Sequence, residues 1–141
     1  MVPKWLHIAI DELGVEEVPG KDKNPRIAEY HKAVSDSGAD EDTSWCSSFA
    51  CWCMERAGIV SPRSMLARSW LNWGHPIQEP RIGCKAIIER GGESWMAHVG
   101  DAIGWTDDYI YLIGGNQQNS VRISVYARSK VIGYRWPKEV A

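Results

Sequence analysis

In the first half of the chain, apolar residues recur at the three-to-four-residue spacing of amphipathic helices. We expect the second of these helices to be capped by Asn24 and to begin at Pro25, the residue types favoured at those two positions. A polar, acidic stretch over residues 35–44 separates it from the third helix, which Gly58 ends. The predicted helices cover residues 4–13, 25 to about 34, about 43–45 to 57, and about 62–73.

After residue 80 the apolar positions alternate with a period of two, which is typical of β-strands. Gly91-Gly92 and Asp107-Asp108 indicate hairpin-type connections. The predicted strands cover residues 84–90, 96–105, 109–113, 119–126 and 131–136. Helices followed by an antiparallel meander predict an α+β fold, in which N-terminal helices pack on a C-terminal antiparallel sheet of about five strands. With no linker or internal repeat, we expect a single domain over residues 1–141.

The composition narrows the class of protein without identifying it. Hydrophobic residues make up 44% of the 141 residues and charged residues 24%, which is ordinary for a globular domain. The net charge of -2 argues against binding nucleic acid by charge alone. No stretch approaches the roughly 18 apolar residues of a membrane span. The N-terminal apolar run meets Asp11 and Glu12 too early for a secretion signal, so we expect synthesis in a host cytoplasm and assisted release.

The cysteines do not form a recognisable disulfide framework. Cys46, Cys51 and Cys53 lie in one predicted helix, where side chains two residues apart point away from each other. A zinc site built from Cys51, Cys53, Cys84 and a histidine is the alternative, although its spacing matches no common zinc motif. Cys53 lies on the apolar stripe of the helix and is interpreted as a core residue. Cys46 differs, because it lies in the first turn.

A thiol in that position is suited to nucleophilic chemistry. The partial positive charge at a helix N-terminus lowers a thiol pKa, so that thiolate is populated near neutral pH. His98, at the start of a strand 52 residues further on, is the candidate base, and Asn116, 18 residues beyond it, would orient the imidazole. Gln117, Asp101 and Glu93 are alternatives for the orienting role. The alternative to the whole set is a buried structural thiol, a structural histidine and a Gly-Gly-Asn turn.

The chain resembles the CHAP group (cysteine, histidine-dependent amidohydrolases/peptidases) of the papain-like NlpC superfamily. More specifically, it is similar to small single-domain phage or prophage peptidoglycan hydrolases. The segments that carry this resemblance run nearly end to end: Glu12–Val15, Glu17–Gly20, Asn24–Ile27 with Tyr30, Trp45–Phe49, Ala57-Gly58, Ala67–Leu71 with Trp73-Gly74, His98–Gly100, Gly114–Gln117 and Gly133–Pro137. Two positions depart from the family pattern. Gly114 stands where many relatives have Glu, and Cys84 stands where they usually have Asp.

The resemblance implies a papain-like fold with Cys46 as nucleophile, His98 as base and Asn116 as orienting residue. It also implies cleavage of an amide in the peptide part of bacterial peptidoglycan, as an N-acetylmuramoyl-L-alanine amidase or an endopeptidase, by a monomer. Alternatives are an interbacterial toxin of the same chemistry and a catalytically inactive wall-binding module.

Substrate and metal contacts are predicted on the same basis. Aromatic rings near the expected cleft are suited to stacking on sugar or peptide. The residues expected to contact substrate are Trp45, Ser47, Trp70, Trp95 and Gln117. Some relatives bind calcium just before the nucleophile, where this chain has Asp36, Asp40, Glu41 and Asp42. Their spacing does not fit an EF-hand, and a solvated acidic loop is the alternative. No other metal or cofactor is expected.

Overall fold

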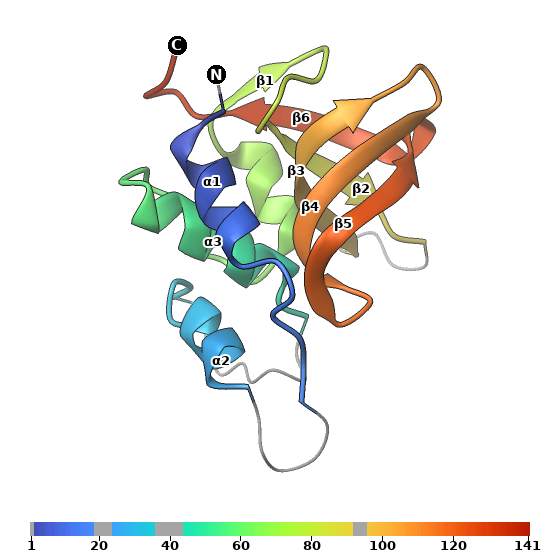
Figure 1. Ribbon diagram of the computed structural model, residues 1–141. Helices are drawn as coiled ribbons and strands as arrows, with labels where there is room; N and C mark the ends of the chain where they lie inside the picture. Colours follow the sequence, from blue (N-terminus) through green and yellow to red (C-terminus); the bar gives the residue numbers. More distant parts are fainter. Residues whose placement is uncertain (1, 19–23, 36–43, 92–95) are drawn as a thin grey trace.

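The computed structural model describes residues 2–18, 24–35, 44–91 and 96–141 (Figure 1). The α-helices are α1 (Lys4–Asp11), α2 (Pro25–His31) and α3 (Cys46–Arg56), and the 3-10 helices are η1 (Ala67–Asn72) and η2 (Arg128–Lys130). The strands are β1 (His75–Ile77), β2 (Lys85–Glu89), β3 (Ala97–Trp105), β4 (Tyr109–Gln117), β5 (Ser120–Ala127) and β6 (Val131–Trp136). The predicted α+β class is confirmed.

The strands form one antiparallel sheet in the order β1-β6-β2-β3-β4-β5. Within the described residues this sheet has six strands, one more than expected. The additional strand is β1, which pairs His75 with Trp136 at the edge of the sheet. The residue pattern predicts no strand at residues 75–77. A three-residue edge strand containing Pro76 is too short for its alternation to be visible.

Strand β4 continues four residues beyond its predicted end at Ile113. The pairing with β5 shifts register between Gly114 and Gln117, and Asn116 in this bulge has a φ of 55°. Asparagine tolerates this left-handed conformation better than most residues. A bulge re-aims the side chains that follow it, and this one lies where the sequence places the third residue of the site.

Helix α3 lies at the centre of the molecule, between the sheet and the other helices (Figure 1). All residues from Cys46 to Met54 are buried, so no face of this part of the helix meets solvent. On the sheet side, Gly115 of β4 allows the strand and the helix to approach closely, because a Cβ at this position would lie 2.8 Å from Phe49 Cβ and from the Trp45 ring.

The other helices differ from expectation mainly at their ends. Asn24 caps α2 as predicted, with its side chain accepting a hydrogen bond from the Arg26 amide. The predicted fourth helix is shorter, a 3-10 turn beginning at Ala67. The chain before it is held by hydrogen bonds to α3, including one from Ser47 Oγ to the Ser64 carbonyl at 2.7 Å.

The two ends of the described chain lie side by side (Figure 1). Val2 and Ala141 line one hollow together with Ala57, which follows the C-terminal end of α3. Trp5 and Trp136 pack edge to face beside it, with ring centroids 5.2 Å apart. Cys46 is at the other end of α3, about 16 Å away at 1.5 Å per helical residue. Among the described residues, no helix is long and apolar enough to cross a membrane.

Candidate active site

Cys46 is the first residue of α3, as the sequence predicts. The N-cap residue, Trp45, makes no side-chain capping hydrogen bond. Ser47 bonds to the Ser64 carbonyl, and Ser44 Oγ lies 3.8 Å from the Cys46 sulfur. The first N–H groups of the helix therefore have no acceptor within the helix, and their positive potential surrounds the thiol.

His98, near the start of β3, is the partner of this thiol. Burial opposes ionisation of Cys46, but the imidazole of His98, the Val99 backbone and the Ser44 hydroxyl together lower its pKa to about 7. Burial likewise opposes protonation of His98, and the Cys46 sulfur with the Gln117 amide raises the imidazole pKa in net. Each group therefore stabilises the charged form of the other, which is the arrangement that produces a thiolate and an imidazolium near neutral pH.

Gln117, at the end of β4, fixes the orientation of the imidazole. Gln117 Oε1 lies 2.8 Å from His98 Nε2. The amide cannot be reversed, because its nitrogen donates to two backbone carbonyls, those of Leu112 at 3.1 Å and Arg122 at 2.6 Å. Since the oxygen can only accept, His98 Nε2 must carry the proton. The neutral imidazole then presents a lone pair on Nδ1, the nitrogen left to face Cys46.

A second ring completes this contact. The Tyr126 hydroxyl donates to the same Gln117 oxygen at 3.0 Å, and the Tyr126 and His98 rings lie 5.4 Å apart between centroids. Gly114 makes room for the amide, because a Cβ there would lie 3.0 Å from Gln117 Oε1. A larger side chain would occupy the space that Gln117 fills.

The hydrogen bond to His98 that was expected of Asn116 is made by its neighbour, Gln117. Asn116 lies in the bulge, and its amide nitrogen donates to Ser44 Oγ at 3.4 Å. Gln117 is the alternative that the sequence offers for this role. The residue pattern does not distinguish the two, because the bulge decides which side chain faces His98. Asp101, another alternative, instead forms a buried ion pair with Lys85.

Three of the residues predicted to contact substrate lie in the core and have no exposed surface. Trp45, Ser47 and Trp70 are completely buried. Trp45 Nε1 donates to Glu17, and Trp70 Nε1 donates to Ser47 Oγ. These side chains hold the start of α3 from inside. The aromatic count indicated a stacking surface, but in this chain those rings supply core volume and internal hydrogen bonds.

The remaining residues of the predicted site are Gln117, which is buried, and a set that lies outside the described residues. Gln117 is 3% exposed, and its polar atoms are engaged as above, so it acts on His98 more directly than on a substrate. Trp95 and Glu93 lie outside the described residues, as does the proposed calcium set of Asp36, Asp40, Glu41 and Asp42.

The remaining thiols lack the features of Cys46. Burial raises the pKa of Cys51 and Cys53, and it raises the pKa of Cys84 to about 11. All four cysteines are free. Within the described part of the chain, no three His, Cys, Asp or Glu side chains are grouped to hold a metal ion. The zinc alternative therefore finds no support there.

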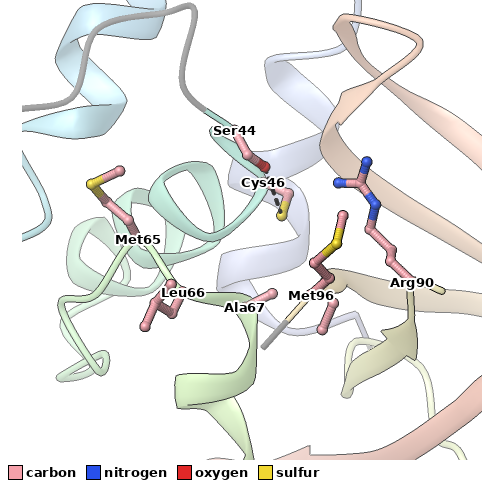
Figure 2. A pocket seen from close by; sticks show the side chains of 8 residues that line it. Ser44, Cys46, Met65, Leu66, Ala67, Arg90 and Met96 are labelled. Carbon is pink, nitrogen blue, oxygen red and sulfur yellow. Dashed lines mark hydrogen bonds between the residues drawn. The ribbon is translucent and has the colours of Figure 1, made fainter. Parts of the chain in front are cut away.

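Two hollows open beside the Cys46–His98 pair. The first, of about 140 Å³, adjoins the thiol and is shown in Figure 2; its lining is Ser44, Cys46, Met65, Leu66, Ala67, Arg90, Met96 and Ala97. The second lies against His98, Gln117 and Tyr126. Arg90 lines both. A substrate backbone laid across the pair would extend into a hollow on either side of the reacting atoms.

In comparisons with known proteins, no protein-family model matches the chain and no curated protein matches it significantly in sequence. A thiol of lowered pKa, a base of defined tautomer and free helix N–H groups are the parts required for nucleophilic attack on a carbonyl.

Proposed function

We propose that the protein is a cysteine hydrolase that cleaves an amide bond in the peptide part of bacterial peptidoglycan. The observation that carries the hydrolase proposal is the Cys46–His98–Gln117 arrangement, in which a thiol with a pKa of about 7 faces an imidazole of fixed tautomer. The substrate class rests on the resemblance to CHAP-type hydrolases, and the bond cut is that of an N-acetylmuramoyl-L-alanine amidase or an endopeptidase.

The proposed reaction begins with attack of the Cys46 thiolate on the amide carbonyl carbon. The carbonyl oxygen takes the negative charge and accepts a hydrogen bond from the Cys46 N–H at the start of α3. His98, now an imidazolium, gives its Nδ1 proton to the departing amine as the carbon–nitrogen bond breaks. A water molecule then attacks the thioester, His98 takes its proton, and the carboxylic acid leaves as the thiolate is restored.

The test is mass spectrometry of purified sacculi after incubation with the wild-type protein and with Cys46→Ala. New fragment ends are expected with the wild type alone. Free lactyl-ended glycan would identify an amidase, and new peptide termini an endopeptidase. Cys51→Ala is the matched control and should retain activity, since it removes a thiol from the same helix without touching His98.

Two results would contradict the proposal. Equal product from Cys46→Ala would exclude the thiol mechanism. Binding of wild-type protein to sacculi of several wall chemotypes, with no new fragment ends on any of them, would favour the inactive wall-binding module.

A further inference from the structure

Arg90 occupies a position that the proposed reaction does not yet use. Ile88 of β2 pairs with His98 of β3, and Arg90 follows two residues after Ile88, just past the strand end. Residues two apart along an extended chain point to the same side of a sheet, and their diagonal neighbours are within reach of a long side chain. Arg90 therefore emerges on the same side as His98 and one step along the cleft.

The charge of Arg90 acts on the site. Its positive charge acts to lower the pKa of both His98 and Tyr126, but burial and the Cys46 sulfur are larger influences, and the net shift of each pKa is upward. Among the described residues, no carboxylate forms an ion pair with Arg90. An exposed guanidinium beside two hollows, with no carboxylate partner in the described chain, is suited to bind an acidic group from outside.

The hollow next to Cys46 adds a second requirement. Figure 2 shows Arg90 and Met96 on one side of it and Met65 and Leu66 on the other. Its volume of about 140 Å³ is close to that of an apolar cavity known to hold one benzene molecule, roughly 150 Å³. A small apolar side chain fits there, and the two methionines can adapt to its shape.

We propose that Arg90 is a specificity-determining residue that binds a substrate carboxylate next to the scissile amide. This rests on the proposed function and narrows its substrate class. The peptide cut carries a small apolar residue and, beside it, an acidic residue whose carboxylate is free. Peptides in which that carboxylate is amidated are poorer substrates. The planar guanidinium can grip a carboxylate with two parallel hydrogen bonds, which a neutral carboxamide cannot match in strength.

The first experiment needs no wall substrate. Alkylation rates of Cys46 are measured with iodoacetate, which is anionic, and with iodoacetamide, which is neutral and of similar size. Arg90→Gln should lower the iodoacetate-to-iodoacetamide rate ratio by roughly two- to fivefold at low salt, the effect of one unit charge a few ångströms away through hydrated space. High salt should reduce the difference. Lys138→Gln, an exposed cation far from both hollows, is the control.

The second experiment uses pairs of synthetic stem peptides that differ only in one carboxylate or carboxamide. Wild-type kcat/KM should favour the carboxylate form by roughly tenfold or more, the range seen for charge-assisted hydrogen bonds. Arg90→Gln should remove the preference mainly through KM, and Arg90→Lys should keep part of it. An unchanged alkylation ratio, or a preference that survives in Arg90→Gln, would overturn the proposal.

The two experiments separate this inference from the proposed function. If the wild-type protein cleaves wall peptides without discriminating the pair, the role of Arg90 is wrong and the hydrolase proposal stands. If it cleaves none of them, the proposed function fails, and the substrate named here fails with it.

Discussion

Gln117 holds His98 with a neutral amide. A carboxylate in that position would add a negative charge to the site and stabilise the imidazolium more strongly. The amide supplies orientation and a defined tautomer without that charge, and it does not itself titrate between acid and alkaline pH. The protonation states of the site then depend on Cys46 and His98 as a coupled pair.

Two alanine variants can test whether Gln117, rather than Asn116, orients the imidazole of His98. Gln117→Ala should lower kcat by on the order of tenfold to a hundredfold, the loss that is typical when the hydrogen-bond partner of a metal-binding histidine is removed. Asn116→Ala should keep kcat close to wild type, although it adds backbone strain at a φ of 55°, because the one side-chain hydrogen bond described for Asn116 is a long one to Ser44. Sacculus digestion kinetics give the comparison. The reverse order of effects would return the orienting role to Asn116.

The thiol pKa predicts a pH dependence with a definite sign. Iodoacetamide should label Cys46 with a midpoint near pH 7, and the rate should fall as pH is lowered, because protonation removes the thiolate. In His98→Ala the midpoint should rise, since burial remains while the main influence that lowers the pKa is lost. Peptide mapping after native labelling is the readout. Labelling of Cys53 or Cys84 at rates similar to Cys46 would contradict the assignment.

At the scale of elements, the site depends on how closely β4 approaches the start of α3. Gly115 is the contact point, with no room for a Cβ between the strand and the helix. Gly114 and Gly115 were recognisable in the sequence only as part of a turn signal. In the structure both residues serve packing: Gly115 lies against the start of α3, and Gly114 lies beside the Gln117 amide. The contact of Gly115 with α3 joins segments that are far apart in the chain, so the local sequence does not reveal it.

Gly115→Ala should therefore destabilise the fold. Over-packing of this kind typically costs about 1–3 kcal/mol, and it would also shift Cys46 relative to His98. Gly104→Ala in β3 is the control, because a Cβ there meets no atom within 4 Å. Urea denaturation of both variants gives the comparison. Equal stability of the two would show that the helix and strand separate without cost.

At the scale of the whole molecule, the interior formed by the described residues contains an ion pair that the proposed chemistry does not use, between Lys85 and Asp101. Lys85 and Asp101 are both almost fully buried, on adjacent strands, and the Lys85 ammonium lies 5.1 Å from the Trp70 ring centroid. The pair thus joins β2 and β3 to η1. A buried charge that loses its partner is costly, whereas an apolar replacement of both partners is often tolerated.

Asp101→Asn should lower the free energy of unfolding by about 3–5 kcal/mol, because it leaves the Lys85 charge buried without its counter-ion. The double variant Lys85→Met with Asp101→Leu should recover most of that loss. Chemical denaturation followed by tryptophan fluorescence measures both. A single variant as stable as the wild type would mean that water reaches the pair.

The sequence was sufficient to predict the α+β class, the cap of α2 and the placement of Cys46 at a helix start and His98 at a strand start. These features follow from local periodicity and capping chemistry. It was insufficient for β1, which is too short to show a pattern, and for the bulge that selects Gln117. It also misplaced Trp45 and Trp70, because a large ring has the same local signature in a core as in a binding groove.

Val2 and Ala141, the two ends of the described chain, lie beside the C-terminal end of α3. Cys46 and the two hollows beside it lie at the other end of that helix. A second domain, an affinity tag or a solid support joined at either terminus would therefore stand clear of the thiol. The same molecule is suited to immobilisation on a surface and to fusion with a separate targeting module, with the reactive side facing away from the tether in both cases.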